Sequence, residues 1–304
     1  MSSRKGHISV NTTDIFPIIK KWLYSEHDIF IRELVSNGCD AITKRASLAR
    51  TGGMEVEPGK VSIAIDKEAG TITFKDNGLG MNEEEVEKYI AQLAFSGAEE
   101  FVQKMKDDGD EKSDIIGKFG LGFYSAFMVA DKVEVESLSM VEGAKATKWT
   151  CAGDTDYEFS DSDKTTIGTE ITLFINEESK EFLDAWKTRE TAKNYCDFLP
   201  YPIQLIDLNE IARITEENAK AEKEEDKKAI TDDIINDVNP LWKRDPSTLT
   251  DEDYKAFYKQ LFPMDPEPLF WLHLNVDHPF TLQGVLFFPK LNPSKPTNES
   301  NIRL

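Results

Sequence analysis

Three polar side chains near the N-terminus recur at helical spacing. Glu33, Asn37 and Asp40 are four and three residues apart, so on an α-helix they lie in one narrow stripe. The opposite stripe is apolar or small throughout and consists of Ile31, Val35, Gly38 and Ile42. Such a helix could hold a general base beside an oxygen ligand for a hard metal ion. An ordinary amphipathic helix also carries acids on its wet face, so the stripe alone does not decide between the two.

A glycine motif follows an expected strand at 71–74. In Asp76–Met81, a carboxylate is followed by Gly78 and Gly80, and glycines let a ligand approach the backbone closely. The same residues are also good turn formers, so the motif fits a plain turn as well.

A second glycine motif covers 117–125, with three glycines before an expected helix. Free amides at a helix N-terminus, with the helix dipole behind them, bind anions. The pattern is neither a Walker loop nor a dinucleotide fingerprint, and glycines also serve as hinges. Gly168-Thr169, before a later strand, is by itself an ordinary turn. The order of all these motifs is more specific than any one of them.

Composition limits the classes of function. With 304 residues the chain can form two domains, and its 39% hydrophobic and 30% charged residues are typical of globular proteins. A formal charge of −20 argues against a broad nucleic-acid surface. We expect no membrane segment and no secretory signal. Cys39, Cys151 and Cys196 are odd in number and far apart, which favours reduced thiols in a cytoplasmic protein over a zinc site.

The hydrophobic patterns predict the elements that must position these residues. We expect helices at 14–24, 27–50, 83–93, 123–129 and 178–198, and strands at 61–65, 71–74, 132–138, 145–151 and 169–175. Residues 96–117 are polar and punctuated by glycine, which is typical of a functional lid or a disordered segment.

A charged stretch at 216–228 has almost no large apolar residue and predicts a linker, or else an exposed helix. Beyond it, a helix at 251–261 and apolar strands at 269–276 and 280–288 predict a second domain. We therefore expect an N-terminal domain at 1–209 with a lid at about 94–120, a linker at 210–230 and the start of a further domain at 231–304. The last of these is expected to be cut short at Leu304.

The order of the motifs resembles the ATP site shared by type II topoisomerases, mismatch-repair ATPases, sensor histidine kinases and heat-shock chaperones. Within that group the chain resembles the 90-kDa heat-shock chaperone family, especially its bacterial branch. The resemblance rests on 23–34, 116–127, 240–242 and 287–290. It implies a two-layer α/β sandwich, with a mostly antiparallel twisted sheet covered by helices, followed by part of an α/β middle domain. It also implies an ATP-dependent molecular chaperone that acts on non-native client proteins.

The resemblance also implies roles for individual residues. Glu33 would act as general base on the attacking water, and Asn37 would give its side-chain oxygen to Mg²⁺. Asp76 would accept a hydrogen bond from the adenine amino group, and guanine presents a carbonyl at the equivalent position. The rest of the ATP or ADP pocket would be formed by Asp40, Gly80, Met81 and Thr169, and by the amides of Gly120, Leu121, Gly122 and Phe123.

This chain departs from the family pattern at three places. Phe95 occupies a position where many relatives carry a lysine, Gly38-Cys39 replaces Ala-Ser, and Lys118 replaces a common glutamine. The family's catalytic arginine and its dimerisation domain would lie beyond Leu304. We therefore expect this stretch of chain to be mostly monomeric and to hydrolyse ATP slowly, whereas the full-length protein would be a homodimer.

Three other functions share the site. A DNA-repair or topoisomerase-type ATPase should carry a basic surface, which the net charge argues against. A sensor kinase needs an acceptor histidine on a long dimerising helix, and none of the four histidines lies in one. A non-catalytic nucleotide sensor has no need of Glu33, whose presence argues weakly against that function.

Overall fold

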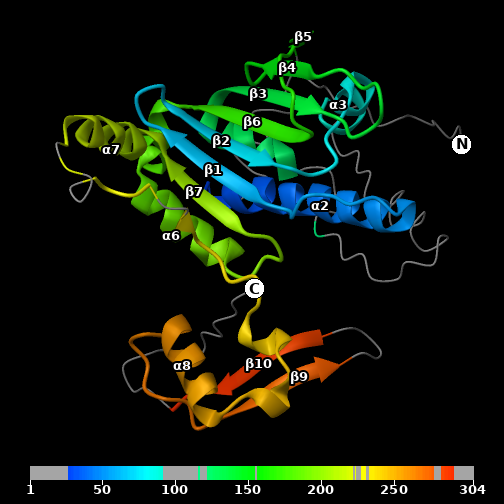
Figure 1. Cartoon of the computed structure of the whole chain (residues 1–304). Coiled ribbons are helices and arrows are strands. Elements are labelled where there is room, and N and C mark those ends of the chain that lie inside the picture. The colour runs from blue at the N-terminus through cyan, green and yellow to red at the C-terminus, as the bar shows by residue number, and fades with distance from the viewer. Residues whose placement is uncertain are drawn as a thin grey trace, which may run out of the picture. The chain divides into compact units, whose positions relative to one another are not determined.

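The computed structural model describes residues 27–91, 116, 122–154, 156–221, 223, 227–230, 233–276 and 282–290. The chain forms two compact units, Met1–Asn236 and Asp237–Leu304 (Figure 1). The boundaries expected from the sequence, with a linker at 210–230, remain a prediction. Part of that stretch is helical, because α7 spans Leu208–Lys220.

A large sheet dominates the first unit. Within the described residues it contains eight strands in the order β5-β4-β3-β6-β2-β1-β7-β8. Their bounds are β1 Val61–Asp66, β2 Thr71–Asp76, β3 Ala130–Leu138, β4 Thr147–Cys151, β5 Tyr157–Asp161, β6 Gly168–Ile175, β7 Ile203–Asp207 and β8 Asp233–Ile234. Neighbouring strands are antiparallel except for the parallel pair β1 and β7. The expected class, α/β with a mostly antiparallel sheet, is confirmed.

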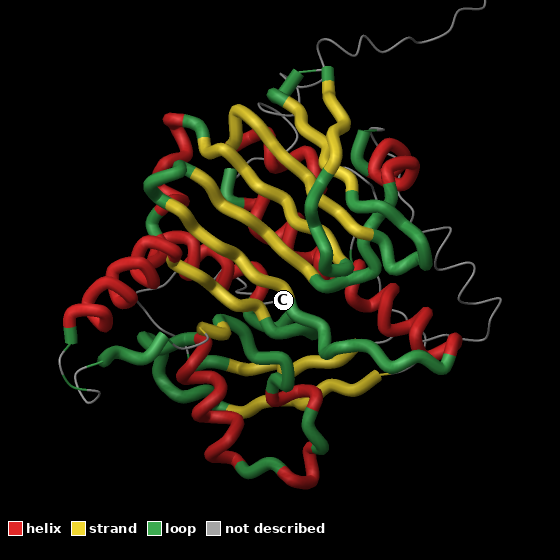
Figure 2. Tube along the Cα trace, turned by 45° about the horizontal axis from the view of Figure 1, so that its top comes forward, coloured by secondary structure: helices red, strands yellow, loops and turns green. Residues whose placement is uncertain are grey.

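Helices cover one face of this sheet (Figures 1 and 2). Within the described residues, the helical segments of the unit are α2 Ile29–Gly52, α3 Glu83–Tyr89, η3 Gly122–Ser125, α5 Ala126–Val129, η4 Glu177–Leu183, α6 Ala185–Cys196 and α7 Leu208–Lys220. The core lies between α2 and the inward faces of the strands. In β1, for example, Val61, Ile63 and Ile65 alternate inward and are buried, as the period of two requires.

Helix α2 differs from a helix with one wet face. Ile31 and Val35 are fully buried, as the apolar stripe predicts. Asp40 on the polar stripe is also buried, with 5% of its surface exposed. The reason is that α2 contacts β1 and β2 as well as η3, α5 and α6. Asp40 is therefore covered by protein, whereas Glu33 and Asn37 of the same stripe are half-buried.

The helix expected at 178–198 is interrupted. A 3₁₀ helix, η4, ends at Leu183, and Asp184 then caps α6 by accepting a hydrogen bond from Lys187 N at 3.0 Å. An aspartate with extended backbone favours an N-cap, which starts a new helix at this point. Strands β5 and β7 were not expected, and the helix expected at 14–24 lies outside the described residues.

The second unit contains a helix and a hairpin. Its elements are η6 Leu241–Lys243, η7 Pro246–Thr248, α8 Asp251–Leu261, β9 Phe270–Val276 and β10 Leu282–Phe288. A capping box, formed by Thr250 and Asp253, starts α8. Tyr258 of α8 packs on Phe287 of β10, with ring centroids 5.0 Å apart. Among the described residues of the chain, no helix is long and apolar enough to cross a membrane.

Candidate active site

A buried carboxylate lies at the end of β2. Asp76 is 9% exposed and pairs across the sheet with Thr169 of β6. Its Oδ1 accepts a hydrogen bond from Gly78 N at 2.8 Å, and the backbone amide of Thr169 also bonds the carboxylate. Burial raises the pKa of Asp76 to about 7, although these amides and the charges of Lys164 and Arg45 oppose the rise. Asp76 is thus a strong acceptor held in a largely dry place.

The turn after β2 fixes the direction of this carboxylate. Asn77 accepts a hydrogen bond from Lys60 N at 2.8 Å and donates to the carbonyl of Pro58 at 2.9 Å. Arg45 of α2 donates to the carbonyl of Asn77. These bonds attach the turn to the residues just before β1 and to α2, on either side of Asp76.

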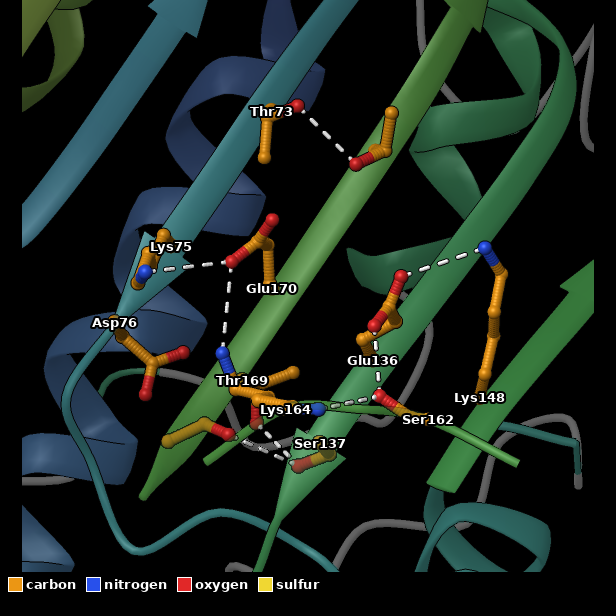
Figure 3. A network of polar contacts seen from close by, with 12 residues as sticks. Thr73, Lys75, Asp76, Glu136, Ser137, Lys148, Ser162, Lys164, Thr169 and Glu170 are labelled. Carbon is orange, nitrogen blue, oxygen red and sulfur yellow. Dashed lines mark hydrogen bonds and ion pairs between the residues drawn. The ribbon is translucent and has the colours of Figure 1, made fainter. Parts of the chain in front are cut away.

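A short chain of hydroxyl groups runs beside Asp76 (Figure 3). Ser137 Oγ lies 2.9 Å from Thr169 Oγ1 and accepts a hydrogen bond from Met81 N at 2.8 Å. Ser137 is fully buried at an inward position of β3, after Val133 and Val135. The sequence prediction missed Ser137, although a serine at an inward position of a strand is a recognisable sign of a polar site. The contact brings the predicted residues Met81 and Thr169 together.

The backbone conformation and the close packing at position 80 require a glycine. Its φ is +64°, and a Cβ built on it would lie 1.9 Å from the carbonyl oxygen of Leu138. The flanking backbone is fixed too, since Leu79 N donates to the carbonyl of Ala41 and Met140 N donates to the carbonyl of Leu79. The structure thus gives a packing reason for this glycine, while its predicted contact with a base remains a prediction.

The other end of the site lies where α2 meets η3. A Cβ on Gly122 would lie 2.3 Å from Oε2 of Glu33, so the first residue of η3 fits directly against that carboxylate. Burial raises the pKa of Glu33, and the nearby charge of Arg32 lowers it. A carboxylate with a raised pKa beside a glycine-rich helix start is suited to act as a base next to a bound anion.

Phe123 fixes η3 on the core. It is buried, and its ring centroid lies 5.9 Å from that of Trp149 in β4 and 5.6 Å from that of Tyr124. The side chain therefore serves packing, whereas the anion contact predicted for this residue concerns its backbone amide.

The middle of α2 carries Asp40 and a lysine that the sequence prediction missed. Asp40 Oδ1 accepts a hydrogen bond from the backbone amide of Ile116 at 2.9 Å, which attaches the chain before the second glycine motif to α2. Lys44 is one helical turn after Asp40, and burial lowers its pKa while Asp40 raises it. Its spacing continues the stripe of Glu33, Asn37 and Asp40, so the pattern could have revealed it.

Cys39 is a packing residue. It is 1% exposed within the core, and burial together with Asp40 and Asp76 raises its pKa to about 12. Its neighbour Gly38 lies close to the sheet, because a Cβ there would be 3.3 Å from Cβ of Asp76. Gly120, Leu121, Phe95, Lys118 and most of the expected lid at 94–120 lie outside the described residues.

The residues present fit a magnesium ion that is bound mainly through phosphates. Among the described residues, no group of three or more His, Cys, Asp or Glu side chains could hold a metal by itself. Mg²⁺ in nucleotide sites uses one or two protein oxygens together with water and phosphate. Asn37, half-buried on the stripe between Glu33 and Asp40, offers one such oxygen.

The fold and this arrangement define a class of protein. Residues 24–188 match the family model of histidine kinase-, DNA gyrase B-, and HSP90-like ATPases, which implies nucleotide binding. Residues 208–304 match the family model of Hsp90 proteins. The chain belongs to the Hsp90 family, as the resemblance of its motifs predicted.

Relatives match over nearly the whole chain. A chaperone protein HtpG of Bacteroides thetaiotaomicron is 49% identical over 99% of this chain and 42% of its own length. The HtpG proteins of Porphyromonas gingivalis and Geobacter metallireducens are 47% and 39% identical over 99% and 89% of the chain. The chain thus spans less than half the length of these relatives, and nothing in the matches favours a DNA-repair ATPase.

Proposed function

We propose that this chain carries the ATP-binding part of an ATP-dependent molecular chaperone. The observation that carries the proposal is the position of α2. This one helix contacts the buried carboxylate end of β2 at Gly38 and, five residues earlier, presents Glu33 to the glycine start of η3. A nucleotide that lies along α2 could place its base at one end and its phosphates at the other.

In this proposal each end has a distinct task. Asp76 accepts a hydrogen bond from the exocyclic amino group of adenine, while Ser137 and Thr169 fix the wall beside it. A guanine carbonyl at the same place would meet a carboxylate, so the site should reject guanine nucleotides. Asp40 and Met81 line the pocket, and Gly80 lets the backbone close on the base.

At the phosphate end, the amides of Gly120, Leu121, Gly122 and Phe123 hold the phosphates, and Asn37 offers an oxygen to Mg²⁺. The metal, when bound, neutralises phosphate charge. Glu33 accepts the proton of the attacking water, which its raised pKa favours.

Calorimetric titration with Mg·ADP tests binding. We expect saturable binding by the parent chain, no measurable binding by Asp76→Asn, and no binding of Mg·GDP. Lys75→Met is the matched control, because it changes the adjacent, partly exposed side chain on β2 and leaves the carboxylate and its turn in place. Absence of binding by the parent, or unchanged binding by Asp76→Asn, would contradict the adenine site.

Hydrolysis is tested separately. Glu33→Ala should keep ADP affinity within a few-fold and lower the ATP turnover rate by on the order of 10²-fold or more, since it removes the general base. Equal turnover by parent and variant would instead indicate a nucleotide sensor.

For the whole protein we propose a homodimer that closes on non-native client proteins in the cytoplasm, without nucleic-acid or membrane partners. The chaperone name of the relatives supports the clients. The three cysteines are free and buried, which fits a reducing compartment.

A further inference from the structure

A buried lysine lies on the sheet face opposite α2. Lys164 follows β5 in the chain, and its side chain is only 6% exposed. Its Nζ lies 3.5 Å from Oε2 of Glu170, and its backbone N donates to Ser162 Oγ at 3.2 Å. Ser162 Oγ in turn donates to Oε2 of Glu136 at 2.7 Å. The loop is thus fixed at both the backbone and the side chain (Figure 3).

The strand register places this ammonium at the same end of the sheet as the candidate adenine site, on the face opposite the Asp76 side chain. Asp76 pairs with Thr169, and Lys75 pairs with Glu170, so Glu170 and Asp76 lie on adjacent strands at the same end of the sheet. Figure 3 shows the side chain of Lys164 reaching past Thr169 toward Glu170, with Asp76 on the neighbouring strand. Lys164 also acts on Asp76 electrostatically, against the effect of burial.

The charges around Asp76 come from several elements. From α2 come the cation Arg45, which also favours the ionised carboxylate, the anion Asp40 and the neutral thiol of Cys39. Before β1 lies Lys60, whose backbone bonds Asn77.

The remaining charges belong to the sheet. On β2 itself Lys75 reaches Oε2 of Glu170 at 3.5 Å, and its side chain is 49% exposed. Glu170 of β6 is shared between this lysine and Lys164. Of the two lysines on Glu170, only Lys164 is buried.

We propose that Lys164 is a positioning residue for adenine recognition, whose buried ammonium keeps Asp76 ionised while Glu170 holds that ammonium in place. This inference rests on the proposed adenine site. A buried charge is screened by solvent much less than an exposed one. Lys164 therefore stabilises the ionised form of Asp76, whereas the exposed Lys75 does not. Ionised Asp76 is a pure acceptor and makes the stronger, charge-assisted hydrogen bond, so this is the form that an adenine amino group favours.

The test is the pH profile of Mg·ADP affinity, measured calorimetrically from pH 6 to pH 9. In the parent, affinity should rise with pH through the ionisation of Asp76. Lys164→Met should shift the midpoint of that rise upward by about half to one pH unit, with a three- to tenfold loss of affinity below the midpoint and little loss at pH 9. Lys164→Arg should restore the parent profile. Lys75→Met, which removes the exposed lysine that contacts Glu170, should leave the midpoint unchanged.

The outcomes separate the two proposals. No Mg·ADP binding by the parent at any pH overturns the proposed function itself. Binding by the parent with the same midpoint in Lys164→Met overturns this inference alone. An equal loss of Mg·ADP affinity in Lys164→Met at all pH values would mean that Lys164 only supports the loop structurally. That result would also overturn this inference. Circular dichroism of each variant shows that the comparison is between folded proteins.

Discussion

Asp76, the proposed adenine acceptor, carries a cost in stability. A carboxyl group that is buried this deeply favours its neutral form, and its pKa of about 7 reflects the balance between burial and the surrounding amides and cations. The amides of Gly78 and Thr169 support the charged form only in part. At neutral pH the protein therefore holds a carboxylate that destabilises the fold in the absence of a ligand, which is common at binding sites.

Asp76→Asn should make the ligand-free protein more stable at high pH. In the unfolded chain Asp ionises near about 3.9, so between that value and about 7 the folded protein keeps a proton that the unfolded chain has lost. The contribution of Asp76 to the free energy of unfolding thus falls as pH rises through this window. We expect the free energy of unfolding of Asp76→Asn to exceed that of the parent by on the order of 1–3 kcal/mol at pH 8, and by almost nothing at pH 4.

Urea unfolding of parent and variant at both pH values measures the difference. Since all other groups are common to the two proteins, their titration cancels. A gain that is independent of pH would contradict the assignment of the raised pKa to Asp76.

Gly80→Ala should be strongly destabilising. A left-handed φ costs a non-glycine residue about 1–2 kcal/mol, and here the new Cβ would also collide with the carbonyl of Leu138. Gly70 is a matched control, because its φ is +70° and nothing lies within 4 Å of a Cβ built there. Gly70→Ala should therefore lower the free energy of unfolding only by this backbone cost. Gly80→Ala should lower it by at least about 2 kcal/mol more. Thermal unfolding of both variants checks the difference, and equal losses would contradict the close approach.

At the scale of elements, the break at Asp184 shows how a local cap divides an apparently continuous helix. Thr188 of α6 reinforces the break, since its Oγ1 donates to the carbonyl of Phe182 at 2.6 Å in a fully buried position. The bond joins α6 to η4, and Phe182 carries its ring into the core against Phe30 of α2. The cap, the hydroxyl and the ring together fix η4 and α6 beside α2.

Thr188→Val should cost about 1–3 kcal/mol, because an isosteric side chain leaves the buried carbonyl of Phe182 without this donor. Thr215→Val in α7 is the control. Its hydroxyl also donates to a backbone carbonyl, at 2.7 Å, but in an exposed position, so its effect should stay within about 0.5 kcal/mol. Chemical denaturation compares the two, and similar values would show that the buried bond contributes little.

The elements differ in how far the sequence predicts them. Strands β1 and β2 alternate clearly between buried and outward residues, so their period of two is visible. Strand β5 is almost wholly exposed at an edge of the sheet and has no such pattern. Strand β7 is short and forms by pairing with the distant strand β1. Local periodicity cannot reveal such a pairing.

The candidate site follows the same division. Glu33, Asn37 and Asp40 could be predicted because one helix fixes their spacing. Ser137 was missed although its inward position on β3 is a visible signal, but its partner Thr169 is set by strand pairing. Lys164 could not be predicted, because it reaches this end of the sheet only through its contact with Glu170.

At the scale of the whole molecule, the chain separates into two compact units, and the described residues of the candidate site all lie in the first. Met1–Asn236 alone should therefore bind Mg·ADP with an affinity within about twofold of the longer chain, since each residue contact described for the site stays within that unit. Calorimetric titration of the shortened and the complete chain checks this. A loss of more than tenfold would show that the second unit contributes to nucleotide binding.

The parallel pairing of β1 with β7 also bears on how the chain folds. Val61 pairs with Ile203, so a strand made early during synthesis waits for a partner made much later. Contacts between residues so distant in sequence slow folding, and the unpaired edge of β1 is exposed to other chains meanwhile. For a protein whose relatives are called chaperones, we therefore expect a sheet that is completed slowly and whose newly made first half is itself open to aggregation.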